Sequence, residues 1–189
     1  FCTGFWEKLI ELHQVDPGAA GLADFGKPEG YIERQVLGWN SRFEKVITPD
    51  VDHFSNVRDW LVANLPAESA RHSILHGDFR IDNVILDEKD PCNILAVLDW
   101  DICALGDPLM DLGNSLAYWI QDDDPPGLKS LAVQPSNAPG MLKRSEILEL
   151  YESRTGIDTS NFTFYQVYGY WRLVVILQQI YFRYFHGQT

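Results

Sequence analysis

The chain has 189 residues, enough for one large domain whose core needs no disulfides. Hydrophobic residues make up 46% of it and charged residues 22%, which excludes an intrinsically disordered chain. Asp and Glu outnumber Lys and Arg by 27 to 15, so the formal net charge is −12 and nucleic acid is not an expected partner. An anionic ligand would need a metal cation or a few local basic side chains to offset this field.

The cysteines and the apolar segments indicate the cellular compartment in which we expect the protein. Three cysteines without a CxxC pair indicate reduced thiols, and we expect a cytoplasmic protein. The most apolar stretch, residues 167–185, is interrupted by Arg172, Gln178, Gln179 and Arg183, so we expect no membrane span and no membrane partner.

The first third of the chain has apolar residues at helical spacing. This pattern predicts a first helix that Asp16-Pro17-Gly18 stops, a second over about 31–46, and a third over about 54–65. The middle of the chain changes to short runs of Ile, Val and Leu. These runs predict strands over residues 73–76, 83–86 and 93–98, of which the last two form a hairpin.

Helical spacing returns after the strands. A helix over 109–120 is predicted with Asp107 as its N-cap and Pro108 at its first position. A proline-rich loop over 121–140 follows, then a helix over 145–154 closed by Gly156. Asn161 is predicted to cap a final helix from 162 to about 186. The pattern predicts a single, mostly helical α+β domain with a small β insert.

Three polar side chains follow the predicted strands, and their types suit phosphoryl transfer. Asp78 and Asn83 lie at the two ends of one turn, and the hairpin returns the chain to Asp99 beside it. Mg²⁺ in phosphotransferases takes carboxylate and other oxygen ligands together with substrate phosphates. A further carboxylate is needed to accept or orient the attacking hydroxyl.

Three motifs carry a resemblance to a known family. They are His-Gly-Asp-x-x-x-x-Asn over 76–83, Leu-Asp-Trp-Asp over 98–101 and Gly-Asp-Pro-x-x-Asp-Leu over 106–112. Together they resemble the aminoglycoside phosphotransferase and choline kinase-like family, which shares the protein-kinase fold. The segment that begins at Leu12 resembles the kinase domains fused to acyl-CoA dehydrogenases and their bacterial relatives. The resemblance implies a small-molecule kinase that uses Mg²⁺ with ATP or GTP and phosphorylates an alcohol, such as a hydroxyacyl compound.

The resemblance also implies roles for individual residues. Asp78 would be the catalytic aspartate, Asn83 and Asp99 would hold Mg²⁺ on the nucleotide phosphates, and Arg80 would contact the γ-phosphate. His76 would brace the loop by hydrogen bonding, and Asp111 would tie down its backbone amides. Asp107 is expected to support the site as a helix cap. Gly77 stands where protein kinases carry an Arg, so an activation-loop phosphorylation switch is not expected.

The chain departs from the family in one large feature, the nucleotide lobe. It contains no G-x-G-x-x-G and no Val-Ala-x-Lys strand before the first helix. We therefore expect residues 1–189 to form the C-terminal lobe, its N-terminal lobe to lie upstream, and this lobe alone to have little activity. The motifs do not distinguish ATP from GTP and predict no oligomeric state.

Several alternatives stay open at the level of sequence. Asp78, Asn83 and Asp99 could be turn-capping residues, and His72, His76 and Asp78 share one strand parity and could bind Zn²⁺. Asp101 could be a ligand, a supporting acid or a solvated residue. The acidic triplet, residues 122–124, is expected in a solvated loop or against a cationic substrate. A non-catalytic scaffold of the same fold and a metal-dependent hydrolase are the competing functions.

Overall fold

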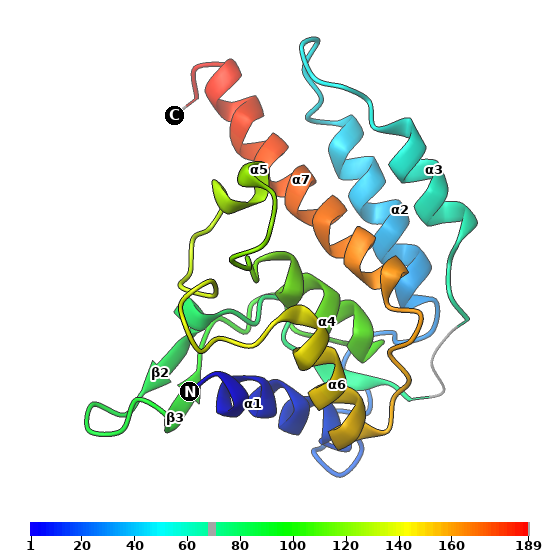
Figure 1. Ribbon diagram of the computed structural model, residues 1–189. Helices are drawn as coiled ribbons and strands as arrows, with labels where there is room; N and C mark the ends of the chain where they lie inside the picture. The colour runs from blue at the N-terminus through cyan, green and yellow to red at the C-terminus, as the bar shows by residue number, and fades with distance from the viewer. Residues whose placement is uncertain (68–70, 189) are drawn as a thin grey trace.

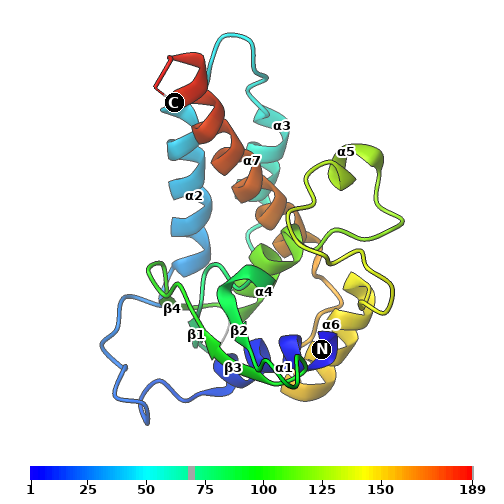
Figure 2. The same ribbon diagram turned by 90° about the vertical axis from the view of Figure 1, so that its left-hand side faces the viewer.

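The computed structural model describes residues 1–67 and 71–188 and has the predicted α+β class. Its elements, in chain order, are α1 (Cys2–Gln14), α2 (Tyr31–Glu44), α3 (Ser55–Ala63), β1 (Ser73–Leu75), a 3₁₀ turn η1 (Ile81–Asn83), β2 (Val84–Leu86), β3 (Ile94–Val97), β4 (Ala104–Gly106), α4 (Pro108–Ala117), α5 (Pro126–Lys129), α6 (Arg144–Thr155) and α7 (Thr163–Phe185). In Figures 1 and 2, α2, α3 and α7 lie side by side, with α1, α6 and the strands below them. Among the described residues, no helix is long and apolar enough to cross a membrane.

Helix α4 is the centre of the fold, and all of its residues are buried. It packs against α7 with the two backbones in close approach. A Cβ atom on Gly113 would lie 2.4 Å from the Tyr165 carbonyl oxygen, and one on Gly169 would lie 2.2 Å from the Gly113 carbonyl oxygen. The two glycines therefore set the distance between α4 and α7, since larger side chains would force the helices apart.

An aromatic cluster joins α1 to the segment that follows β1. The Phe5 ring lies 4.5 Å from that of Phe79 and 5.9 Å from that of Trp119, measured between centroids. Phe5, Phe79 and Trp119 are each about 1% exposed. This packing fixes Phe79, one residue after Asp78, in the core, and so limits the movement of the loop that carries Asp78.

The predicted hairpin is confirmed, but one strand was missed. β2 and β3 pair antiparallel, with Val84 opposite Val97. β1 pairs antiparallel with β4 (Ala104–Gly106). The sequence pattern predicts no strand over these three residues. Such a short run that ends in glycine has too few residues to show strand alternation, and β4 is defined by its pairing with β1.

Most predicted helices are confirmed to within a few residues, and two features near the end of the chain were wrong. The 121–140 loop contains the short helix α5. The N-cap position of α7 is Phe162, which makes no side-chain cap hydrogen bond, so the predicted Asn161 cap is wrong. Phe162 is instead 5% exposed and belongs to the core cluster, so apolar packing, and not a polar cap, determines where α7 begins.

Candidate active site

Asp111 of α4 holds the backbone of the loop after β1. Its Oδ2 accepts a hydrogen bond from the His76 amide at 2.7 Å, and its Oδ1 accepts one from the Gly77 amide at 2.8 Å. Asp111 is 1% exposed. Two charge-assisted hydrogen bonds inside the protein fix the loop more firmly than neutral ones would. Asp111 therefore makes the contacts with the loop amides that the motif implies.

His13 and Tyr151 lie outside the three motifs, and both extend the Asp111 network. His13 Nε2 lies 3.2 Å from Asp111 Oδ2, and His13 Nδ1 lies 2.8 Å from the Tyr151 hydroxyl. Burial alone would raise the pKa of Asp111, but the hydrogen bond and charge of His13 and the loop amides hold that pKa below its usual range. The only sequence signal was a histidine within the apolar stripe of the first helix, where a buried partner was to be expected.

Gly77 gives the loop its sharp turn. Its φ is +84°, and a Cβ at this position would lie 2.8 Å from the Ile102 carbonyl oxygen. Residues with a side chain rarely adopt this φ, and this one would also collide with backbone. The glycine is thus required by the turn that places Asp78 next to the Asp111-bound amides.

His76 uses both of its ring nitrogens within the loop. Nε2 donates to the Leu98 carbonyl oxygen at 2.8 Å, and Nδ1 accepts from the Asp78 amide at 3.2 Å. The side chain is fully buried. With no lone pair left for a metal, His76 does not fit the zinc interpretation with His72 and Asp78, and its geometry is that of a bracing residue.

Asp78 and Asn83 face each other across the loop. The Asn83 amide nitrogen donates to the Asp78 carbonyl oxygen at 2.8 Å and lies 3.3 Å from Asp78 Oδ2. The Leu98 amide donates to the Asn83 carbonyl oxygen at 2.8 Å, which brings the residue after Leu98, Asp99, beside them. The structure thus gathers the predicted pair and the Asp99 segment in one region.

Asp99 and Asp101 are both exposed, and within the described ranges neither carboxylate has a hydrogen-bond or ion-pair partner. Asp99 has a φ of +64°, a conformation that Asp tolerates better than most residues. Among the residues the structure describes, no three His, Cys, Asp or Glu side chains gather to form a metal site by themselves. An Asn oxygen and one carboxylate do fit Mg²⁺, which takes its remaining ligands from water and phosphates.

Arg80 is directed toward acids and an aromatic ring. Its Nε lies 3.4 Å from Asp78 Oδ1, a terminal nitrogen lies 2.9 Å from Asp82 Oδ2, and its guanidinium carbon lies 4.9 Å from the centre of the Tyr118 ring. Arg80 is therefore next to the Asp78 carboxylate, and a phosphate would have to compete with Asp78 and Asp82 for it.

Asp107 is confirmed as the N-cap of α4. Its Oδ1 accepts from the Leu109 amide at 2.8 Å, and Pro108 occupies the first helical position. Burial raises the pKa of Asp107, while the backbone hydrogen bonds from Leu109 and Met110 act against that rise. The cap fixes the start of the helix that carries Asp111, so Asp107 supports the site from a distance.

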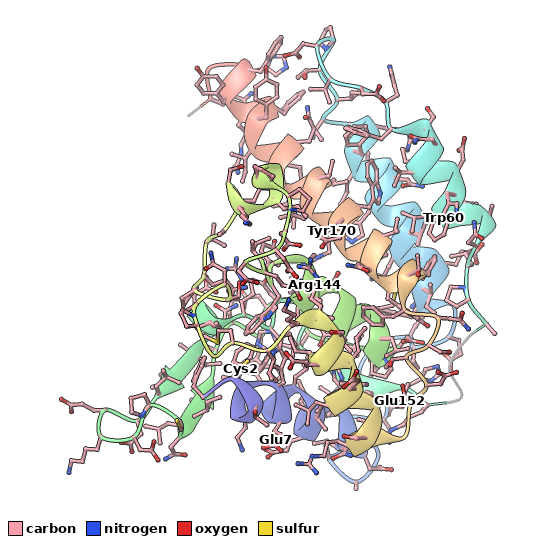
Figure 3. The ribbon with its side chains drawn as sticks, viewed as in Figure 1. Cys2, Glu7, Trp60, Arg144, Glu152 and Tyr170 are labelled. Carbon is pink, nitrogen blue, oxygen red and sulfur yellow. The ribbon has the colours of Figure 1, made fainter. Side chains whose placement is uncertain are left out.

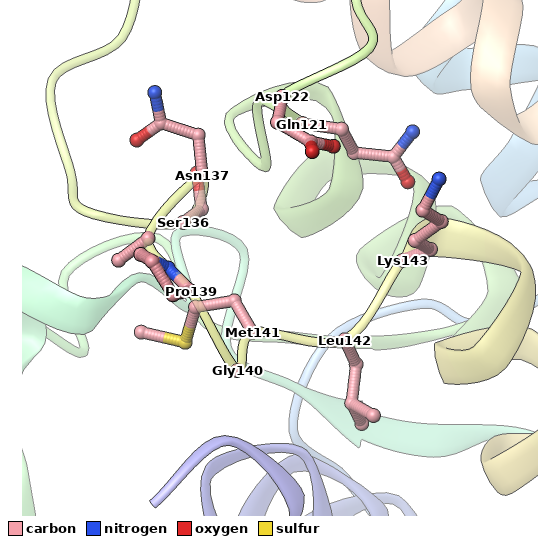
Figure 4. A pocket seen from close by; sticks show the side chains of 10 residues that line it. Gln121, Asp122, Ser136, Asn137, Pro139, Gly140, Met141, Leu142 and Lys143 are labelled. Atoms are coloured by element: carbon pink, nitrogen blue, oxygen red, sulfur yellow. The ribbon is translucent and has the colours of Figure 1, made fainter.

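The acidic triplet is mostly used within its own loop. The Arg144 guanidinium forms an ion pair with both oxygens of Asp124, which is 7% exposed, and Lys143 Nζ lies 2.7 Å from Asp123. Figure 3 shows Arg144 at the start of α6, directed toward the interior. Asp124 is thus a buried partner, contrary to the expectation of a solvated loop. Asp122 is exposed and lines a hollow of about 370 Å³ together with 136–143 (Figure 4).

The same loop reaches the segment that follows Asp78 through Gln134. Its Oε1 accepts from the Ile81 amide at 2.9 Å, and its Nε2 donates to the Tyr118 carbonyl oxygen at 3.1 Å. Gln134 is 7% exposed. Gln134 could not be recognised from the sequence, because a glutamine in a proline-rich loop gives no sign of a distant partner.

The fold and the loop after β1 define a class of protein, the phosphotransferases with a kinase-like fold. The loop region has an aspartate at a glycine turn, an asparagine five residues on and an aspartate after a hairpin. The model of the phosphotransferase enzyme family matches residues 1–146, and the chain belongs to that family. It is 34% identical over 189 residues to mouse acyl-CoA dehydrogenase family member 10 and 31% identical over 186 residues to human acyl-CoA dehydrogenase family member 11.

Solved structures agree with this assignment. An aminoglycoside phosphotransferase homologue from Ralstonia eutropha JMP134 superposes with a TM-score of 0.79 at 30% identity, over 99% of this chain and 58% of that one. Macrolide 2'-phosphotransferase type I superposes with a TM-score of 0.66 at 15% identity, over 95% of this chain and 52% of that one, and so shares the fold. The matches to the mouse and human relatives cover 99% and 97% of this chain but only 17% and 23% of those proteins.

Proposed function

We propose that this chain is the C-terminal, catalytic lobe of a two-lobed kinase that transfers the γ-phosphoryl group of ATP or GTP to the hydroxyl group of a small molecule. One observation carries the proposal: the Asp78 carboxylate stands on a turn whose backbone is bound to buried Asp111, with Asn83 across from it and the Asp99 segment alongside. This is a preorganised arrangement, which phosphoryl transfer requires because positioning and electrostatics supply most of its catalysis.

In the proposed reaction, Asp78 accepts or orients the proton of the acceptor hydroxyl. Its Oδ2 lies 3.3 Å from the Asn83 amide nitrogen and its Oδ1 lies 3.4 Å from Arg80 Nε, so each oxygen has a nitrogen donor beside it that fixes its position. A carboxylate at a fixed position can take the proton as the bond between the acceptor oxygen and the γ-phosphorus forms. The bond from the γ-phosphorus to the oxygen that bridges it to the β-phosphate breaks in the same transfer, and ADP or GDP leaves. Arg80 would then turn from Asp78 and Asp82 toward the γ-phosphate.

Asn83 and Asp99 are the residues that would hold Mg²⁺. The ion, when bound, neutralises charge on the nucleotide phosphates. Exposed Asp99, with no partner among the described residues, is available for this role, and buried Asn83 is fixed by its hydrogen bond to the Asp78 carbonyl.

Several large apolar side chains are exposed around this proposed nucleotide site, and we propose that the N-terminal lobe covers them. Large hydrophobic side chains on the hairpin and the Asp99 segment are between 39% and 58% exposed: Ile85, Leu95, Leu98, Trp100 and Ile102. Large apolar side chains exposed beside a site are typical of an interface. The Ralstonia protein, of which this chain matches 58%, has the additional length that a second lobe needs.

By resemblance to the dehydrogenase-fused relatives, we propose an alcohol acceptor of the hydroxyacyl type. The test is Asp78→Asn in the full-length polypeptide, assayed for nucleotide-dependent phosphorylation of a library of alcohols. Turnover should fall by about 10²- to 10⁴-fold while the thermal unfolding curve is unchanged. Asp59→Asn, at an exposed position on α3, is the matched control and should keep wild-type turnover. Wild-type turnover in Asp78→Asn would overturn the assignment of Asp78 as the catalytic base.

A further inference from the structure

A second pocket lies behind the catalytic loop, between α2 and α7. It has a volume of about 250 Å³, and Gly77, the residue before Asp78, forms part of its wall. Arg42 and Trp39 of α2 and Arg172 of α7 line it from the other side. This volume is below the roughly 300–1,000 Å³ typical of sites for drug-sized ligands, so the pocket suits a small molecule or one end of a longer one.

Arg172 is the unusual residue of this pocket. It is 6% exposed, and its guanidinium carbon lies 5.3 Å from the centre of the Trp39 ring. Across the residues described by the structure, no carboxylate lies within ion-pair distance of Arg172 or of Arg42, whose guanidinium lies 4.4 Å from the same ring. The buried guanidinium of Arg144, in contrast, is paired with Asp124.

A buried cation without a counter-ion is costly, because desolvation is not compensated by an opposite charge. Stacking on an aromatic ring recovers only part of that cost. In a chain with a formal net charge of −12, two arginines directed into one pocket without acidic partners concentrate positive potential where an anion could bind.

This pocket lies close to the proposed reaction centre. The charges of Arg172, in the pocket, and of Asp78 both act on the Tyr118 hydroxyl. Burial raises the pKa of Tyr118, the charge of Arg172 opposes this rise, and the charge of Asp78 adds to it. Asn114 of α4, 5% exposed, also lines the pocket, and its side-chain oxygen has no hydrogen-bond partner among the described residues. Such an oxygen can accept a hydrogen bond from a hydroxyl group of a ligand.

We propose that this pocket binds an anionic group of the acceptor, a carboxylate or a phosphate monoester, with Arg172 as the buried anchor and Arg42 at the rim. The inference rests on the proposed phosphotransferase function and narrows its substrate class to anionic alcohols. A guanidinium offers paired N–H donors that match the two oxygens of either group. The hydroxyl at the other end of the molecule would then lie toward Asp78.

The test is a calorimetric titration of the full-length polypeptide without nucleotide, using four probes: 3-hydroxybutyrate, glycerol 3-phosphate, neutral 1,3-butanediol and cationic choline. We expect at least one anionic probe to bind tenfold or more tightly than 1,3-butanediol, and the tighter of the two identifies the anionic group. Arg172→Gln should weaken that binding at least tenfold. Arg183→Gln, an exposed arginine on the same helix, is the matched control and should stay within twofold of wild type.

Three results of the titration would overturn the inference: no binding of either anionic probe at millimolar concentration, equal binding of the diol, or unchanged binding in Arg172→Gln. Should Arg172→Gln fail to fold, Arg42→Gln takes its place, with an expected loss of at least threefold and the same interpretation if nothing changes. Anion binding without phosphorylation of any alcohol would refute the proposed function alone. Phosphorylation of choline or the diol that is insensitive to Arg172→Gln would refute this inference alone.

Discussion

The two sides of the loop that carries Asp78 differ in how their polar groups are satisfied. On the anchored side, formed by Asp111, His13 and Tyr151, the hydrogen bonds lie within the core and join α1, α4 and α6. On the open side, formed by Asp78, Arg80 and Asp99, the side chains are half-buried or exposed.

This difference separates stability from chemistry. Groups that are paired in the core stabilise the folded chain, and removing one partner leaves the others unpaired. Groups on the open side are partly or fully exposed and so are available to ligands. Substitutions on the anchored side should therefore change the free energy of unfolding, whereas those on the open side should change binding and turnover.

The largest effect is expected from Asp111→Ala. The substitution leaves the amides of His76 and Gly77 and the ring of His13 without their acceptor in the core. The free energy of unfolding should fall by about 3–5 kcal/mol, the range for removing one partner from a buried, charged hydrogen-bond network. Urea denaturation measures this, with Asp59→Ala at an exposed position as the control, expected within about 0.5 kcal/mol of wild type. A loss below about 1 kcal/mol for Asp111→Ala would contradict the role of the anchored side.

The depressed pKa of Asp111 gives this contribution a pH dependence. The pKa of Asp111 is lower in the folded chain than in the unfolded chain, where it is about 3.9. The ionised carboxylate therefore stabilises the folded chain at any pH above the unfolded pKa. This contribution is lost as the pH falls through the folded pKa. The difference in free energy of unfolding between wild type and Asp111→Asn should shrink as the pH falls below about 4. Denaturation curves at a series of pH values test this, and a difference that grows on acidification would show the opposite sign of shift.

Gly77→Ala tests the junction between the two sides. The new Cβ meets a positive φ of +84° and the Ile102 carbonyl oxygen at 2.8 Å, so we expect a loss of about 1–3 kcal/mol. Gly140→Ala is a matched control, because Gly140 has a φ of +88° with nothing within 4 Å of the new Cβ. Its loss should be smaller, since it carries the φ strain without the collision. Equal losses in the two variants, by thermal or urea denaturation, would remove the collision from the argument.

Tyr151→Phe should have a smaller effect on the anchored side. It removes the hydroxyl that lies 2.8 Å from His13 Nδ1 and leaves the Asp111 hydrogen bonds in place, for an expected loss of about 1 kcal/mol. Tyr165→Phe is the control, since Tyr165 is a buried residue whose hydroxyl has no hydrogen-bond partner among the described residues. A loss in Tyr165→Phe as large as that in Tyr151→Phe would show that the His13 contact is not what matters.

The same comparison explains how much of the molecule could be predicted from the sequence. The residues of the open side belong to short sequence motifs, so Asp78, Asn83 and Asp99 could be predicted as site residues. The structure brings their segments together. The anchored side depends on residues far apart in the chain: His13 meets Asp111 across a separation of 98 residues and Tyr151 across a separation of 138. Only the motif that contains Asp111 could be recognised locally.

The fold shows the same division. Helices with a clear apolar stripe were predicted to within a few residues, because their periodicity is local. β4 was missed because its three residues become a strand only by pairing with β1. The Asn161 cap was wrong because burial of Phe162 determined the start of α7. Local rules fail where tertiary packing decides between two acceptable local choices.

The smallest effect on stability is expected from Asp99→Asn, and this variant separates the two sides most clearly. Asn tolerates the positive φ of +64° as well as Asp does, and the side chain is exposed without a partner in the described part of the chain. The free energy of unfolding should change by less than about 0.5 kcal/mol. Mg²⁺-dependent nucleotide binding by the full-length polypeptide, measured by calorimetry, should nevertheless fall at least tenfold, because Mg²⁺ prefers a carboxylate to an amide. Asp101→Asn, two residues along and also exposed, should keep the wild-type affinity for the Mg²⁺–nucleotide complex. An equal loss of affinity in Asp101→Asn would assign the loss to the local negative charge and not to a metal ligand at Asp99.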